Sequence, residues 1–201
     1  TGEVLVPAPT SSFAVISDID DTVLQTGTPH MLQMLRNVML GNARTRMPLP
    51  GVAALYQALH AGQTGHDANP LFYVSNSPWN LYDLLVEFFQ LHEIPVGPVL
   101  FLRNWGIYDD ELWPTDHRKH KLPVIRQMVE LFEDLPFILI GDSGESDPEI
   151  YYEIVRRYPG RIRAIYVRNA GNDLERPKAI QTLAERVVES GSTLVLANDS
   201  L

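Results

Sequence analysis

Short apolar runs alternate along this chain with longer stretches in which apolar residues recur at helical spacing. The runs are rich in β-branched and aromatic residues and carry no polar face, as in strands buried on both sides of a parallel sheet. They cover residues 13–17, 71–75, 98–102, 137–140, 162–167 and 193–196. The helical stretches cover residues 31–40, 51–61, 79–91, 122–132, 174–190 and a segment that starts at 148. This alternation predicts an α/β domain with a doubly wound parallel sheet.

Two segments do not fit the alternation. The helical stretch within residues 25–49 predicts a small helical insertion over the end of the first strand. Residues 103–120 have no clear period but carry Trp105, Tyr108 and Trp113, and an irregular segment this long is often a functional lid. Packing for the fold is an equally good explanation of these aromatic residues.

The length of 201 residues suits one domain with such an insertion. We assign residues 13–201 to it and read the Pro- and Ser-rich residues 1–12 as a linker. Because the chain begins at Thr1 rather than Met, we expect a fragment or a processed product.

Composition narrows the classes of function. The chain has no cysteine, which excludes disulfides and thiolate metal sites. Its net charge is −9, from 16 Lys and Arg against 25 Asp and Glu. This balance disfavours nucleic acid as a partner and purely electrostatic docking on anionic membranes. No apolar run approaches the ~20 residues of a membrane span, and no signal peptide is visible. The predicted location is the cytoplasm, with peripheral membrane attachment as a second expectation.

Acidic residues follow two of the predicted strands. Asp18 and Asp20 come after the first, and Asp142 comes after the run 137–140. Ligands bind at the carboxyl ends of strands in open α/β sheets, so these acids are expected to converge, although Asp is also a common turn residue. Two charges ~4 Å apart repel by roughly 4 kcal/mol at an effective dielectric near 20. Such a group needs a cation, and an all-oxygen site favours Mg²⁺ over Zn²⁺.

The same edge offers groups that bind phosphate. Ser75 follows the strand 71–75 and precedes a helix start, where a hydroxyl and backbone amides form an anion site; it could also be only a helix cap. Lys121 directly precedes the apolar helix 122–132 and is preferred over Lys119 as the cation. An Asp carboxylate can attack phosphorus and form an aspartyl-phosphate. A second Asp can then act as general acid and base.

The motifs resemble those of a known family. The string Ser17-Asp18-Ile19-Asp20-Asp21-Thr22-Val23 resembles the first motif of the haloacid dehalogenase superfamily of phosphohydrolases, whose domain is Rossmann-like. Ser75, Lys121 and the pair Asp142 and Asp147 match its second, third and fourth motifs in order. The longer strings Tyr73-Val74-Ser75-Asn76-Ser77-Pro78-Trp79 and Gly141-Asp142-Ser143-Gly144-Glu145-Ser146-Asp147-Pro148-Glu149-Ile150-Tyr151 resemble the catalytic domain of the actin-patch phosphatidate phosphatases, which has fungal and bacterial members. The match covers residues 11–168.

The resemblance implies a role for each residue. Asp18 would be the nucleophile and a Mg²⁺ ligand, and Asp142 a further ligand. Asp20 would be the acid and base and would lend its backbone carbonyl to Mg²⁺. A separate group would hold the phosphoryl, consisting of Ser75, Asn76 and Lys121. Asp147 would not bind the metal directly but would orient Lys121 or a metal-bound water, although a residue before Pro148 can also be a simple helix cap.

The resulting prediction is a Mg²⁺-dependent phosphomonoester hydrolase that converts phosphatidate to diacylglycerol. Two alternatives stay open: a phosphatase for a soluble phosphate ester, which the acidic charge favours, and a catalytically idle module that binds metal and phosphate. A lipid substrate needs an apolar rim around the site. The helical face of residues 31–40 and the Trp105–Trp113 segment are candidates for it, but packing also explains the former. Arg44 and Arg46 could meet a second anionic group or be solvated.

Overall fold

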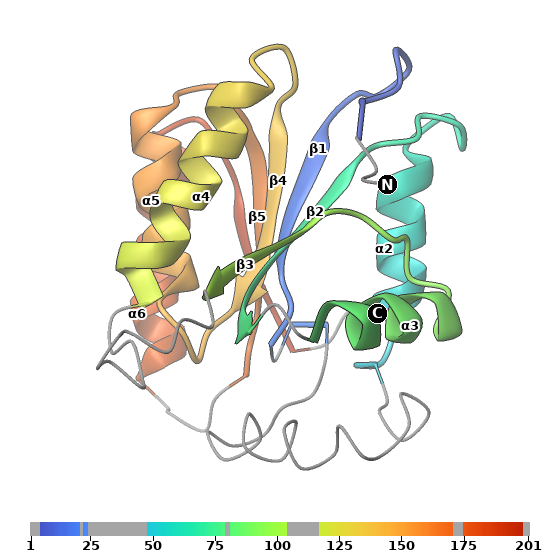
Figure 1. Ribbon diagram of the computed structural model, residues 1–201. Helices are drawn as coiled ribbons and strands as arrows, with labels where there is room; N and C mark the ends of the chain where they lie inside the picture. The colour runs from blue at the N-terminus through green and yellow to red at the C-terminus, as the bar shows by residue number, and fades with distance from the viewer. Residues whose placement is uncertain are drawn as a thin grey trace.

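The sheet predicted from the apolar runs is present, with all its strands parallel. A computed structural model (Figure 1) describes residues 5–20, 22–23, 48–78, 81–103, 117–170 and 175–198. The strands are β1 (Ala14–Asp18), β2 (Leu71–Pro78), β3 (Val99–Arg103), β4 (Phe137–Asp142), β5 (Ile162–Arg168) and β6 (Leu194–Ala197). Their order in the sheet is β3-β2-β1-β4-β5-β6, and every neighbouring pair is parallel. This is a doubly wound, Rossmann-like fold, as predicted.

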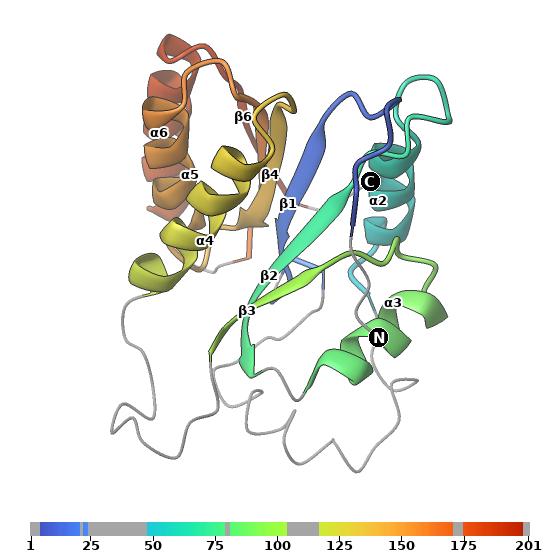
Figure 2. The ribbon, with the colours of Figure 1, turned by 45° about the horizontal axis from the view of Figure 1, so that its top comes forward.

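Helices cover both faces of the sheet. They are α2 (Val52–Ala61), α3 (Tyr82–Leu91), α4 (His117–Leu131), α5 (Asp147–Arg157) and α6 (Arg176–Glu189). Figures 1 and 2 show α2 and α3 on one side of the strands and α4, α5 and α6 on the other. Within the described ranges, no helix is long and apolar enough to cross a bilayer.

The central strand β1 joins two apolar cores. Its five residues are all buried, and successive side chains of a strand point to opposite faces. Ala14 and Ile16 therefore pack into the core under α4, α5 and α6, whereas Val15 packs into the core under α2 and α3. Burial on both faces explains why the β1 sequence is continuously apolar up to Ser17.

Some predicted boundaries were wrong. Helix α4 begins at His117 and not at 122, so Lys121 lies inside the helix, and Pro123 also lies within it. Residues 117–121 are polar or charged, so the apolar helical spacing in the sequence begins only at Leu122. Strand β2 continues to Pro78, beyond the predicted end at Ser75, and α3 begins only at Tyr82.

The end of the predicted linker is attached to the domain. Thr10 donates a hydrogen bond to the carbonyl of Asp67, and the Ser12 amide donates to Asn69 Oδ1 at 2.8 Å. Most of the predicted insertion, residues 24–47, lies outside the described residues, and so do Trp105, Tyr108 and Trp113.

Candidate active site

Three adjacent strands end at the site. In the registers of the central sheet, Asp18 of β1 pairs with Val74 of β2, and Ser17 pairs with Ile140 of β4. Ser75 and Asp142 therefore follow within one or two residues of the level of Asp18. The strands β2 and β3 lie on one side of β1 and the later strands on the other, so the chain switches direction across the sheet between β1 and β4. In such folds a crevice opens at this point, outside the carboxyl ends of the strands.

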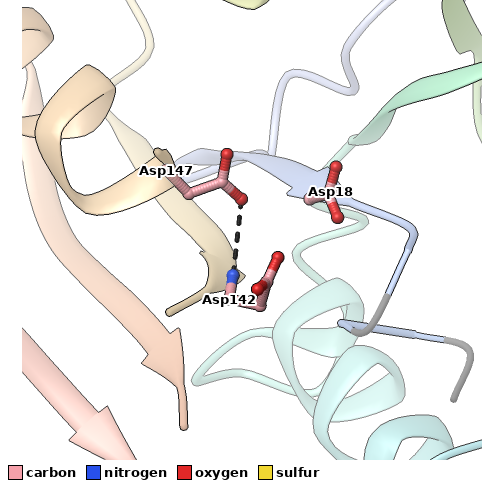
Figure 3. A group of neighbouring side chains, drawn as sticks. All are labelled: Asp18, Asp142 and Asp147. Atoms are coloured by element: carbon pink, nitrogen blue, oxygen red, sulfur yellow. Dashed lines mark hydrogen bonds between the residues drawn. The ribbon is translucent and has the colours of Figure 1, made fainter. Parts of the chain in front are cut away.

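A group of three buried carboxylates occupies this edge. Asp18, Asp142 and Asp147 each offer one oxygen atom, and these atoms lie within 4.8 Å of one another (Figure 3). Asp18 comes from the end of β1, Asp142 from the end of β4 and Asp147 from the first residue of α5. None of the three residues is more than 1% exposed. Buried acids at this density need compensating positive charge.

Lys121 supplies part of that charge. Its Nζ donates hydrogen bonds to Asp18 Oδ1 at 2.8 Å and to Asp147 Oδ1 at 2.5 Å. A third carboxylate, Glu145 Oε2, lies at 3.4 Å, and its side chain is 25% exposed. Together with Asp142, four acids surround one lysine, so the described site keeps an excess of negative charge.

The pKa values reflect this imbalance. Burial raises the pKa of Asp142 to about 7, and the charges of Asp147 and Glu145 add to the effect. Burial also raises the pKa of Asp18 well above its usual range, although Lys121 opposes the shift. Burial would lower the pKa of Lys121, but the charges of Asp147 and Asp18, with smaller effects of Tyr151 and Glu145, together raise it.

The unpaired oxygen atoms fit a bound cation. Asp18 Oδ2 and Asp142 Oδ2 are buried and have no hydrogen-bond partner in the described part of the chain. The other oxygen of Asp142, Oδ1, accepts hydrogen bonds from the amides of Gly144 and Glu145 at 2.6 and 3.1 Å. Both oxygens of Asp147 have partners, since Oδ1 meets Lys121 and Oδ2 meets the amide of Asp142 at 3.3 Å. The free atoms of Asp18 and Asp142 are therefore the candidate metal ligands, with Asp147 one shell further out. Hard carboxylate oxygens are the ligands that Mg²⁺ prefers.

A glycine and a tyrosine shape the seat of Asp147. A Cβ at Gly141 would lie 2.2 Å from Asp147 Oδ2 and 2.8 Å from the Tyr151 hydroxyl. That hydroxyl donates to the carbonyl of Ile140 at 2.8 Å. Glycine is therefore required at 141 for the close approach of α5 to the end of β4.

A second tyrosine supports the strand end that carries Asp18. Ser17 Oγ donates to the carbonyl of Asp18 at 2.6 Å, so the Tyr56 hydroxyl, 2.5 Å from the same Oγ, is the donor to Ser17. Tyr56 stacks on Tyr73 with ring centroids 6.2 Å apart. Helix α2 thereby fixes the backbone at Asp18 from the opposite face.

Most residues singled out in the sequence come together at this edge. Asp18, Asp142, Asp147 and Lys121 are in direct or near contact, and Ser75 is buried within β2, one residue beyond Val74, the partner of Asp18. Asp20 is half-buried, and its charge contributes to the raised pKa of Asp18. The side chains of Asn76 and Lys119 lie outside the described structure.

Sequence reasoning gave no role to Glu145, Tyr151, Tyr56 or Arg176. The first two stand within the quoted fourth motif, so their spacing from Asp142 was the available signal. The sequence held no such signal for Tyr56 and Arg176, because both residues are separated in the chain from every motif.

The chain is similar to known proteins over most of its length. The chain is 34% identical over 163 residues to Phosphatidate phosphatase APP1 of Saccharomyces cerevisiae, an alignment that covers 81% of this chain and 27% of that protein. It is 30% identical over 167 residues to an uncharacterized protein of Schizosaccharomyces pombe, covering 81% and 26%. The chain thus spans about a quarter of the length of these relatives.

A solved structure, DsGPDH of Dunaliella salina, superposes with a TM-score of 0.48 at 18% identity, covering 87% of this chain and 36% of that one. This likeness is too weak to add to what the strand order establishes. The family model described as Phosphatidate phosphatase APP1, catalytic domain, matches residues 13–169, a range that includes all the acids of the site. The chain therefore belongs to the family of the APP1 phosphatidate phosphatase catalytic domain.

Proposed function

We propose that this chain is a Mg²⁺-dependent phosphomonoesterase that acts through an aspartyl-phosphate on Asp18, with phosphatidate as its substrate. One observation carries the proposal. Asp18 has one carboxylate oxygen on Lys121 at 2.8 Å, while its other oxygen and one of Asp142 are buried and have no partner among the described residues. A carboxylate held in this way by a lysine and a cation can attack phosphorus without leaving its place.

The reaction assigns a step to each residue. An oxygen of Asp18 attacks the phosphorus atom, the bond from phosphorus to the ester oxygen breaks, and Asp20 gives its proton to the leaving alcohol. Asp20 then takes a proton from water, which attacks the phosphorus and releases phosphate from Asp18. Ser75, Asn76 and Lys121 hold the phosphoryl oxygens, since catalysis of this transfer is mainly positioning and charge stabilisation.

The residues that would hold Mg²⁺ are Asp18 and Asp142, with the backbone carbonyl of Asp20. The ion would neutralise charge on the phosphoryl oxygens and offset the repulsion between the acids. Asp147 would orient Lys121 and the backbone of Asp142. The motifs of the haloacid dehalogenase superfamily, which the sequence resembles, support the same division of roles.

We choose phosphatidate as the substrate because of the similarity to the yeast protein APP1. The yeast protein is a phosphatidate phosphatase by name, and 27% of its length aligns with this chain. Turnover would then take place at a membrane surface, and the diacylglycerol would stay in the membrane. With a net charge of −9, docking would depend on apolar contacts more than on charge.

The test is a panel of phosphate-release assays with Mg²⁺, using phosphatidate in mixed micelles, soluble phosphate esters and a generic aryl phosphate. We expect phosphatidate to give the highest kcat/KM. Hydrolysis of soluble esters alone would contradict the lipid substrate but not the phosphatase. No turnover of any ester would favour the idle binding module, although such a module has no need of Asp20.

Two variants then ask where the lipid is recognised. Trp105→Ser and Trp113→Ser are expected to lower turnover of micellar phosphatidate and to spare a small soluble ester, because remote contacts affect access and not the phosphoryl step. An equal loss of both activities would identify these residues as part of the packing.

A further inference from the structure

An arginine outside the family-matched segment holds the loop between the acids of the site. Arg176 is the first residue of α6, beyond the match that ends at 169. Its Nε donates to the carbonyl of Ser143 at 2.8 Å, and its Nη2 donates to the carbonyl of Glu145 at 2.8 Å. Both carbonyls belong to the loop that separates Asp142 from Asp147. The guanidinium thus links the residues on either side of Gly144.

The same guanidinium is fixed on its other side by Glu149 in the first turn of α5. Nη1 lies 2.5 Å from Glu149 Oε1, and Nη2 lies 2.9 Å from Oε2, a forked pair in which two N–H groups meet two oxygens. We call this arrangement of Arg176, Glu149 and the carbonyls of Ser143 and Glu145 the α5–α6 clamp. An open hollow of about 370 Å³ lies beside it.

The position of Arg176 contradicts the usual preference of helices. A cation at a helix N-terminus meets the positive end of the helix dipole and is normally disfavoured there. The N-cap of α6 is Glu175, which makes no side-chain cap hydrogen bond, and the first turn of α6 has no acid, whereas that of α5 has Asp147 and Glu149. A residue that breaks a local rule, donates two hydrogen bonds to the loop carbonyls and two to Glu149 of α5 points to a requirement of that loop.

The clamp reaches the candidate metal ligand through a single peptide unit. The carbonyl of Ser143 and the amide of Gly144 belong to the same planar, trans peptide, so they point in opposite directions. Arg176 binds the carbonyl at 2.8 Å, and the amide donates to Asp142 Oδ1 at 2.6 Å. Holding the Ser143 carbonyl in place therefore also holds the Gly144 amide, which donates its hydrogen bond to Oδ1 of Asp142. The other oxygen, Oδ2, is the one that is left without a partner in the described residues.

We infer that Arg176 is a positioning residue for metal binding: through the α5–α6 clamp it determines which oxygen of Asp142 is presented to the cation. The inference rests on the proposed function, because it assumes that Asp142 is a ligand. It also extends the functional unit to α6, beyond the segment that carries the motifs.

Isothermal titration of Mg²⁺ into the protein without substrate tests this inference, with unfolding in urea measured alongside. We expect Arg176→Gln to weaken Mg²⁺ binding by roughly ten- to hundredfold, the usual effect of losing a partner that orients a ligand. Arg176→Lys should lose part of the affinity, because an ammonium group cannot reproduce the fork. If Arg176→Gln does not fold, Arg176→Lys provides the test in its place. Glu149→Gln should lose less, since the bonds to the loop carbonyls remain.

Arg161 provides a matched control. Its Nη2 also donates to three backbone carbonyls, those of Val129, Phe132 and Leu135, but these lie near the end of α4, away from the strand ends that carry the acids. Arg161→Gln should lower stability in urea and leave Mg²⁺ affinity unchanged.

Each other outcome decides the question. Equal Mg²⁺ affinity in wild type and Arg176→Gln would overturn the inference alone and leave the proposed function in place. An equal loss in Arg161→Gln and Arg176→Gln would show general loosening and would also overturn it. A wild type that binds no divalent cation would overturn the proposed function together with the inference.

Discussion

The ammonium of Lys121 and the carboxylate of Asp18 form a buried ion pair, with Nζ 2.8 Å from Oδ1, between residues 103 positions apart in the chain. Lys121 is 0% exposed and Asp18 1% exposed. Because water does not screen this pair, the lysine stabilises the negative charge of Asp18 in the folded protein. It also places a cation at the proposed site of the phosphoryl group. Lys121 thus connects helix α4 to the end of β1 at the candidate nucleophile.

Replacing Lys121 by Met should therefore affect both stability and turnover. Removing one partner of a buried pair leaves the other charge uncompensated, at about 3–5 kcal/mol; proton uptake by Asp18 and Asp147, whose pKa values are raised, reduces this loss. Loss of a positioned donor should lower kcat by roughly 10²–10³-fold. Urea unfolding and hydrolysis of an aryl phosphate measure the two effects.

Lys178→Met is the matched control for Lys121→Met. Lys178 pairs with Glu175 at the surface, where the lysine side chain is 73% exposed, so the change should alter stability by less than about 1 kcal/mol. Near-normal turnover in folded Lys121→Met would remove this lysine from the phosphate site.

Gly141→Ala tests the seat of Asp147. The added Cβ would lie 2.2 Å from Asp147 Oδ2, so the carboxylate must move away from Lys121 and from the amide of Asp142. Overpacking of this kind destabilises by roughly 1–3 kcal/mol, and we expect turnover to fall with it.

Gly160→Ala is the comparison for this variant, because a Cβ there meets nothing although its φ is +76°. It should lose stability through backbone strain and keep full activity. Unchanged activity in Gly141→Ala would show that Asp147 can shift without consequence.

The architecture was predictable because each buried strand is visible in the sequence as an apolar run. Ala14, Val15 and Ile16 are hydrophobic because β1 is covered on both faces, so its strand character needed no tertiary information, whereas its central place in the sheet came only from the structure. Asp18 and Asp142 were identifiable for a related reason, since strand ends meet at one edge, and Lys121 was identified by its place before an apolar helical stretch. Tyr56 and Arg176 could not be found in this way, because their partners are distant in sequence and are brought to them only by packing. These partners are the Ser17 hydroxyl for Tyr56, and two loop carbonyls and the Glu149 carboxylate for Arg176.

The start of α4 shows a different limit. The sequence predicted a helix from 122, but the structure has an earlier start at His117. Residues 117–121 are polar or charged, so the apolar spacing that marks the helix begins only at Leu122. The missed turn includes Lys121, whose buried contacts with Asp18 and Asp147 are tertiary.

Metal affinity should depend on pH through Asp142. Its pKa is raised from the ordinary value of 3.8 to about 7, and a metal binds the deprotonated form, so protons compete below this value. Apparent Mg²⁺ affinity should rise by up to about tenfold per pH unit below 7 and level off above it. Calorimetric titration across this range measures it, and Asp142→Asn should bind weakly at every pH. A flat profile in the wild type would argue against Asp142 as a ligand.

The same shift predicts the stability of the metal-free protein. A carboxyl whose pKa is higher in the folded state binds more protons folded than unfolded, so the free energy of unfolding falls as pH rises from about 4 to about 7. Urea unfolding in excess chelator should show this fall, and Asp142→Asn should reduce it. Stability that rises through this window in chelator would contradict the assigned direction.

Chelation and exchange of the cation test the ligand set. Excess chelator should abolish turnover and Mg²⁺ should restore it, while Ca²⁺ should bind but inhibit. The longer and looser coordination of Ca²⁺ would misplace Asp18 against phosphorus. Full turnover in excess chelator would exclude Asp18 and Asp142 as metal ligands that the reaction requires.

The most direct test of the proposed reaction is to trap the phosphoryl group on the protein. Enzyme mixed with substrate and Mg²⁺ is quenched during turnover and treated with borohydride, which reduces an acyl phosphate to an alcohol, and the peptides are then analysed by mass spectrometry. We predict that Asp18 alone is converted to homoserine, that omission of Mg²⁺ abolishes the conversion, and that Asp18→Asn lowers turnover by roughly 10⁴-fold or more. Sustained turnover with Asp18 unmodified, or with modification at another residue, would contradict Asp18 as the nucleophile.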